Sequence, residues 1–223
     1  MFSKELNKKL DKYHLLRHPF YEYFWNEGKL TREIIKDYAE QYYQHVKAFP
    51  RYISATHSIC DDIEKRKILL ENLQDEENKD GDHPMLWKKF AAAMGADIKK
   101  IDDVKPDWFT KDMIDNFFAQ ARSSYAEGLA SLYTYERQIP EIAETKIQGL
   151  KKFYGVNSKD GLHFFEAHKS ADVHHRAECE KLLDSLSKEE QAKAEKASML
   201  TARYLWNFLS GMTAKHKLQA VAA

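Results

Sequence analysis

Residues 163–175 read His-Phe-Phe-Glu-Ala-His-Lys-Ser-Ala-Asp-Val-His-His and hold the densest group of metal-competent side chains in the chain. The stretch contains no glycine or proline and has helix-forming flanks, so it is predicted to be helical. His168, Asp172 and His175 then follow a stripe covering roughly 60° of the helix surface. Two imidazoles and a carboxylate that face one point form the ligand set of a non-haem iron site or a similar oxygen/nitrogen site. A solvated polar helix face fits the same pattern, so the interpretation needs support from other segments.

The composition describes a single cytoplasmic helical domain. The chain has 223 residues, of which 35 are Lys or Arg and 35 are Asp or Glu, so the formal net charge is zero and binding to nucleic acid is not expected. Two cysteines, Cys60 and Cys179, are too few for a disulfide scaffold, which favours a reducing cytosol. The N-terminus lacks an apolar signal core, and no apolar run is long enough to cross a membrane, so no membrane association is expected.

Helical periodicity dominates the whole chain and predicts one all-α domain over residues 1–215, with a disordered tail at 216–223. Thr31 is expected to cap a long helix, which Pro50 should kink or break. His83 is expected at a helix junction, because the residue before Pro84 avoids the α region. The predicted helices cover residues 3–14, 18–27, 31–50, 62–78, 84–95, 110–138, 141–154, 159–185 and 188–214.

A carboxylate on an apolar helix face is the first supporting observation. Glu136 shares a stripe with Leu129, Leu132 and Tyr133. Burial of an unpaired carboxylate is costly, so this side chain is expected to shift its pKa, pair with a cation or bind a metal.

Two further acids show the same pattern in an earlier helix. Glu76 follows Leu69 and Leu73, but Glu77 follows apolar positions equally well, so periodicity does not choose between them. His83 lies seven residues beyond Glu76. Ligands from facing helices build carboxylate-bridged di-metal sites in bundle cores. The set of three carboxylates and three imidazoles that we expect to converge is Glu76, His83, Glu136, His168, Asp172 and His175.

Three more side chains have two readings each. Lys146 shares a face with Leu150, where it either extends to water or becomes a desolvated amine with a lowered pKa, suited to act as a nucleophile or amino donor. Tyr21 and Tyr135 are packing aromatics by default. Beside an oxidising metal they would be oxidisable phenols.

Several motifs together resemble a known family. They are His18-Pro-Phe-Tyr21, Tyr42-Tyr-Gln-His-Val-Lys-Ala-Phe-Pro50, Asp75-Glu-Glu-Asn78, Tyr135-Glu-Arg-Gln-Ile-Pro140 and His168-x-x-x-Asp172-x-x-His175. From about residue 14 to 210 the chain resembles the Chlamydia protein associating with death domains and its bacterial homologues. These are haem-oxygenase-like di-metal oxidases, related in fold to the pyrroloquinoline-quinone synthase PqqC and to TenA thiaminases. The resemblance implies an all-α, compact seven- to eight-helix bundle with the haem-oxygenase-like fold, commonly a homodimer.

The resemblance also implies a chemistry. It implies a dinuclear Fe/Fe or Fe/Mn centre with Glu76 rather than Glu77 as ligand, working with O2 and an external reductant. The implied reaction forms p-aminobenzoate for folate biosynthesis from a tyrosine of the protein itself. By motif position the sacrificed residue is Tyr21, although the segment differs in length from the family pattern and leaves Tyr23 as an alternative. Tyr135 would be a redox-active or supporting phenol, and Lys146 the amino donor.

Two other classes of function compete with this one. The first is a PqqC-like oxidase or TenA-like hydrolase, or a di-metal oxygenase acting on an external small molecule. TenA chemistry needs a nucleophilic cysteine, and neither Cys60 nor Cys179 lies in an activating context. The second is an interaction protein that binds death-domain proteins through a helical surface, a reading that does not explain six metal-competent side chains.

Overall fold

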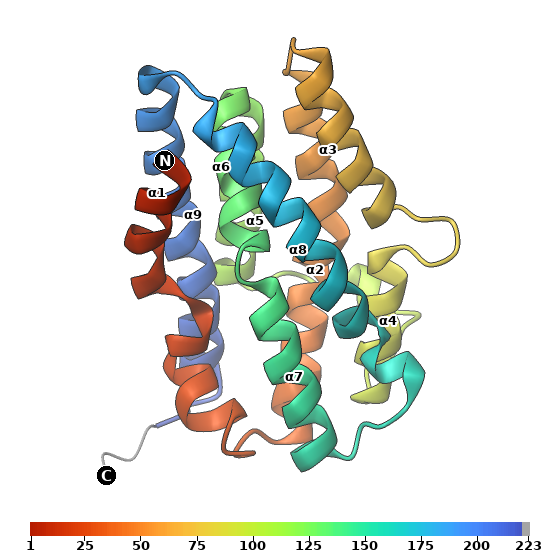
Figure 1. The fold of residues 1–223 in the computed structure, drawn as a ribbon. Helices are drawn as coiled ribbons and strands as arrows, with labels where there is room; N and C mark the ends of the chain where they lie inside the picture. The colour runs from red at the N-terminus through yellow and green to blue at the C-terminus, as the bar shows by residue number, and fades with distance from the viewer. Residues whose placement is uncertain (220–223) are drawn as a thin grey trace.

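The computed structural model describes residues 1–219, with the side chains of residues 170–174 left out. Within this range the chain forms nine α-helices, three short 3-10 turns and one π-helical turn, and it contains no strand (Figure 1). The all-α prediction is confirmed, with nine helices in this part of the chain where seven to eight were expected. The helices are α1 (Phe2–Leu10), α2 (Arg32–Ser58), α3 (Ile63–Glu76), α4 (His83–Ala93), α5 (Trp108–Ser123), α6 (Tyr125–Glu136), α7 (Ile139–Tyr154), α8 (Lys159–Asp184) and α9 (Lys188–Lys215).

The helices pack as a bundle around α2, α6 and α8. Helix α6 lies along α9, α7 runs beside α8, and α2 packs on α5 and α4 (Figure 1). The consecutive helices α3 and α4 thereby meet α6 and α8, which lie much later in the sequence, around one point. No described helix is long and apolar enough to span a membrane.

The long helix α2 corrects one expectation. The Thr31 side chain caps it by accepting from the amide of Ile34, as predicted. Pro50 was expected to kink or break it, but the helix continues to Ser58. A proline inside a helix removes one backbone hydrogen bond. Here the residues around it are buried, and packing of that kind outweighs the lost bond.

A second correction concerns residues 110–138, which were predicted to form one helix. They form parts of two helices, because Ser124 has extended dihedral angles of φ −156° and ψ 162°. Its hydroxyl accepts from the amide of Glu127 and caps α6. Serine is a favoured N-cap residue, and the break turns α6 so that Glu136 ends inside the bundle.

The segment before α2 is wound as a π-helix over Phe20–Trp25 and carries Tyr21. It lies close against α7 because residue 149 is glycine: a Cβ there would lie 2.4 Å from the indole Nε1 of Trp25. That Nε1 donates to the backbone carbonyl of Thr145 over 3.3 Å. The contact holds Tyr21 and α7 in a fixed relation.

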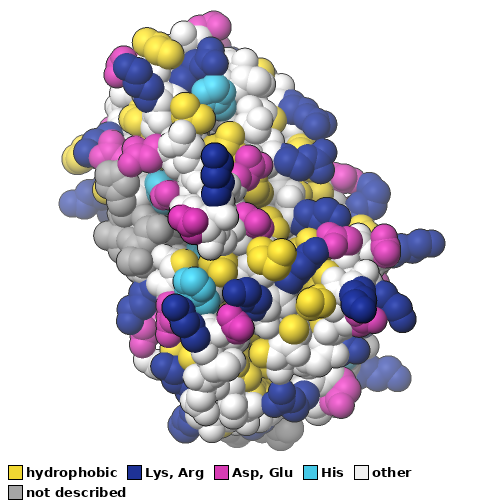
Figure 2. Space-filling model, turned by 90° about the vertical axis from the view of Figure 1, so that its right-hand side faces the viewer, with side chains coloured by type: hydrophobic (Ala, Val, Ile, Leu, Met, Phe, Trp, Pro, Cys, Tyr) yellow, Lys and Arg dark blue, Asp and Glu magenta, His cyan; other side chains and the backbone are white. Residues whose placement is uncertain are grey.

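The surface carries both signs of charge. Figure 2 shows Lys and Arg side chains interspersed with Asp and Glu over one face of the molecule. Such a face lacks the basic field that attracts nucleic acid.

The close contact at Gly149 gives a stability prediction. Alanine is the better helix former, but Gly149→Ala places its methyl group against the Trp25 ring. The steric cost of overpacking should exceed the gain in helix propensity. The free energy of unfolding, measured by denaturant titration, should fall by about 1–3 kcal/mol. The control is Gln148→Ala at the exposed neighbouring position, with an expected change within about 0.5 kcal/mol. A more stable Gly149→Ala protein would contradict this packing.

Candidate metal centre

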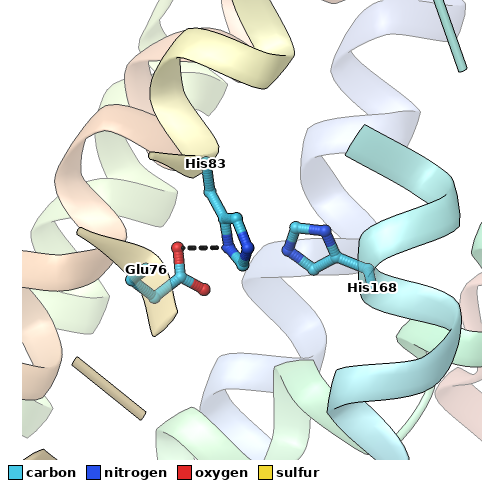
Figure 3. A group of neighbouring side chains, drawn as sticks. All are labelled: Glu76, His83 and His168. Carbon is cyan, nitrogen blue, oxygen red and sulfur yellow. Dashed lines mark ion pairs between the residues drawn. The ribbon is translucent and has the colours of Figure 1, made fainter. Parts of the chain in front are cut away.

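Three of the predicted ligands converge in the bundle. Glu76 is the last residue of α3, His83 the first of α4, and His168 lies within α8 (Figure 3). All three are buried, and one ligand atom from each lies within 4.8 Å of the others. The Asp82 side chain caps α4 by accepting from the amide of Met85 and so fixes where His83 begins the helix. The exposed Glu77 faces away, so the structure distinguishes the two acids that periodicity left equivalent.

The pairing of Glu76 with His83 fits a bound cation. The His83 Nδ1 lies 2.8 Å from a carboxylate oxygen of Glu76. The same buried nitrogen has no partner with hydrogen-bond geometry among the described residues. Burial has the largest single effect and lowers the pKa of His83. The contact with Glu76 and the charges of Asp75 and Asp82 together outweigh burial, so the pKa is raised overall. The His83 nitrogen and the Glu76 oxygen lie close together without a good hydrogen bond, an arrangement suited to binding the same metal ion.

His168 is prepared as a neutral ligand. Its Nδ1 lies 2.7 Å from the backbone carbonyl of Phe164, and because a carbonyl only accepts, this nitrogen carries the proton. The lone pair is then on Nε2, which faces the other ligands. Burial, with the charge of His83, holds the pKa of His168 well below its usual range. Such an orienting hydrogen bond is typical of metal-binding histidines.

Glu136 lies beside this group with its own partners. It is only 2% exposed, one carboxylate oxygen accepts from the Asn72 side chain over 2.6 Å, and the other lies 3.8 Å from the Cys179 sulfur. Burial, together with the charge of Glu76, raises the pKa of Glu136 to about 7, although the hydrogen bond from Asn72 and the charge of His175 act in the opposite direction. The two carboxylates are therefore electrostatically coupled, as expected for acids that share a metal centre.

His175 is a further predicted ligand that the structure describes. It is buried, and its Nε2 lies 2.9 Å from a carboxylate oxygen of Asp75. Its charge acts on both Glu136 and His168, so it lies near the same point. The side chain of Asp172, the remaining predicted ligand, lies outside the described residues.

The sequence reasoning missed Asn72, Asp75 and Cys179. Asn72 precedes Glu76 by four positions and Cys179 follows His175 by four, so helical spacing places each on its neighbour's face. That signal was available. Asp75 lies one residue before Glu76, and no spacing rule would have joined it to His175.

A small cavity opens from the other side of His168. It has a volume of about 20 Å³ and is lined by all three residues predicted for the chemistry, Tyr21, Tyr135 and Lys146, together with Tyr38 and Tyr42. Tyr21 is 1% exposed, whereas the alternative Tyr23 is 45% exposed and faces outward.

Lys146 does not extend to water but ends inside the cavity, where it is 3% exposed. Its Nζ donates to the hydroxyl of Tyr38 and lies 4.2 Å from the centre of that ring. Burial holds the pKa of Lys146 well below its usual range, because the ammonium form loses its hydration. The structure therefore selects the desolvated amine.

Known proteins support these observations. The profile of a family described as iron-containing redox enzymes matches residues 36–206. A protein of Chlamydia muridarum named 4-aminobenzoate synthase is 40% identical over 209 residues, which cover 93% of this chain and 88% of the relative. A protein of Nitrosomonas europaea with the same name is 39% identical, covering 95% and 90%. A solved domain from Shewanella denitrificans with a haem-oxygenase-like fold superposes with a TM-score of 0.80 at 16% identity, covering 96% and 91%. The predicted fold and resemblance are confirmed.

Glu136 gives a pH-dependent prediction for chelator-treated protein. Its folded pKa of about 7 exceeds the ordinary 4.5, so the folded state retains a proton that the unfolded state loses as pH rises from 4.5 to 7. The free energy of unfolding of the wild-type protein therefore falls by about 3 kcal/mol as the pH rises through this window.

Glu136→Gln removes the ionisable group and with it this decrease in stability. In calorimetry the variant should melt at a higher temperature than wild type at pH 8 and at nearly the same temperature at pH 4.5. The control is Glu77→Gln at an exposed position. An equal difference between Glu136→Gln and wild type at both pH values would contradict the buried carboxylate.

Proposed function

The chain belongs to the family of iron-containing redox enzymes, and on that premise we propose that it is a 4-aminobenzoate synthase, the name its relatives carry. It is an oxidoreductase with a buried metal-binding group of one carboxylate and two imidazoles. The proposal also covers the source of the carbon and nitrogen atoms, for which the cavity beside that group provides the argument.

We propose a dinuclear Fe/Fe or Fe/Mn centre. Glu76, His83 and His168 would hold one ion, and Glu136 and His175, with Asp172, the other. When bound, the centre would supply oxidation by dioxygen, with electrons from an external reductant. The protein contributes the ligand geometry, the neutral imidazole of His168 and the buried carboxylate of Glu136, whose negative form a bound cation would stabilise.

The size of the cavity carries the proposal. About 20 Å³ holds a molecule the size of water or dioxygen, whereas pockets for aromatic ligands measure roughly 300–1,000 Å³. A phenol of the protein, that of Tyr21, already lines this cavity together with His168 and Lys146. We therefore propose that Tyr21 supplies the aromatic ring by oxidative self-sacrifice, and that the exposed Tyr23 does not.

The other cavity residues take supporting roles. Lys146 is the amino donor, because its lowered pKa favours the free amine that can form a bond to carbon. Tyr135 follows directly before Glu136 in sequence, and its hydroxyl is hydrogen-bonded to Tyr42. Tyr135, which also lines the cavity, would serve there as a redox-active or supporting phenol.

The competing functions have less support. A cavity of this size disfavours an external small molecule for a PqqC-like oxidase or a di-metal oxygenase. A TenA-like hydrolase would need a reactive thiolate, but burial raises the pKa of Cys179 well above its usual range, and Cys60 is also buried. The homodimer, the death-domain partner and the cytoplasmic location stay predictions.

Self-sacrifice is testable by mass. The iron-loaded protein is reduced without oxygen, exposed to oxygen, and examined by intact mass, peptide mapping and assay of 4-aminobenzoate. We expect one mass loss, located at Tyr21, in proportion to the product formed. Tyr21→Phe should form at least about 100-fold less 4-aminobenzoate, because phenylalanine lacks the oxidisable hydroxyl.

Tyr23→Phe is the matched control, since it removes the same atom from the same turn on the exposed side. It should match wild type in yield and in mass loss. Product formed with an unchanged intact mass would show an external substrate instead.

A further inference from the structure

A chain of hydrogen bonds crosses the cavity from Lys146 to Tyr21 through Tyr38. The Lys146 amine donates to the Tyr38 hydroxyl, and that hydroxyl is hydrogen-bonded to Tyr21. Tyr21, Tyr38 and Lys146 all line the same small cavity. Because the Tyr38 oxygen accepts from the amine, its own O–H is free to donate to the oxygen of Tyr21. The chain therefore runs in one direction, from N–H through O–H to the oxygen of Tyr21.

Tyr38 is held firmly in this position. It is 2% exposed, and its ring stacks between Tyr42 and Phe20, with centroids 5.4 and 5.6 Å away. The remaining neighbours of the Lys146 amine are ring faces that accept no proton. The centroids of Phe165, Trp87, Trp25 and Tyr42 lie 5.2–5.8 Å from Nζ. Tyr38 is thus the group to which this amine passes a proton.

The proposed reaction needs such a transfer. In tyrosine an oxygen stands para to the side-chain carbon, and in 4-aminobenzoate a nitrogen stands para to the carboxyl carbon, so Cζ of Tyr21 exchanges oxygen for nitrogen. If dioxygen at the iron centre first oxidises the ring by two electrons, Cζ becomes a carbonyl carbon. The amine then adds to it, a C–N bond forms, the C–O bond breaks, and one water leaves. This condensation is redox-neutral, and both hydrogens of the water come from the amine. A proton then leaves Cε of Lys146 and one joins Cβ of Tyr21, so the ring regains its two electrons and the C=N bond moves to Cε. Hydrolysis of that bond breaks Cε–Nζ, frees the arylamine and leaves an aldehyde on the side chain of residue 146.

We propose that Tyr38 is the proton-transfer residue of this exchange, passing protons from the Lys146 nitrogen to the departing oxygen of Tyr21. Tyr38 accepts a proton from the amine as its own proton moves to Tyr21, so it ends each transfer unchanged. The inference rests on the proposed function. It adds that amination and ring oxidation are separable, and that a protein without the Tyr38 hydroxyl releases the ring with its oxygen as 4-hydroxybenzoate.

Tyr38→Phe tests this separation. The reduced, iron-loaded variant is exposed to oxygen, and both benzoates are measured by mass spectrometry. We expect the ratio of 4-aminobenzoate to 4-hydroxybenzoate to fall by about 100-fold, the usual scale of proton-transfer catalysis. The control is Tyr52→Phe on the same helix, which removes an equally buried hydroxyl that has no hydrogen-bond partner among the described residues. It should retain the wild-type ratio.

The outcomes separate the two proposals. A wild-type protein that forms no 4-aminobenzoate refutes the proposed function, and the role of Tyr38 falls with it. A wild-type ratio in Tyr38→Phe refutes only the role of Tyr38. If that variant forms neither benzoate, the wild-type protein is studied in mixtures of H2O and D2O. If the yield of 4-aminobenzoate per dioxygen consumed falls along a curve as the D2O fraction rises, two protons move in the same step, which supports the relay. A yield that does not depend on the D2O fraction overturns it.

Discussion

The burial of a carboxylate, that of Glu136, imposes the strongest constraint on this structure. An ionised acid inside a bundle costs several kcal/mol unless hydrogen bonds or positive charge compensate it. One amide hydrogen bond from Asn72 is insufficient, as the pKa of about 7 shows. In the proposed centre a metal ion would supply the missing charge, and the neutral imidazole of His168 and the ring of His175 would help to hold it. In this account the fold is less stable without the ion, because the buried carboxylate then lacks full compensation.

The same helices connect this constraint to the aromatic cavity. Helix α8 presents His168 to both the ligand group and the cavity, and α7, packed along α8, presents Lys146. The cavity walls are aromatic, so the amine there loses its charge more readily, and the phenol of Tyr21 is kept from water. His168, the amine and the phenol thus line one space with room for dioxygen and little else. This arrangement is the basis for proposing that a protein side chain serves as the substrate.

The all-α fold and most of the metal-competent residues followed from the sequence, because helical periodicity depends on local spacing. The predictions that failed or stayed open were of two kinds. Capping at Ser124 and packing around Pro50 overrode periodicity, and the choice between Glu76 and Glu77 needed the orientation of a helix end that neighbouring helices determine. Helical spacing did not single out Tyr38. Its amine partner lies 108 residues away, and local spacing does not reveal a pairing over that distance.

The most direct test of the central claim is the location of iron. Crystals of protein loaded with ferrous iron without oxygen should be measured on both sides of the iron absorption edge. We predict two anomalous peaks about 3.5–4 Å apart, one among Glu76, His83 and His168 and the other beside Glu136 and His175. Absence of an iron peak within bonding distance of His168 would contradict the account.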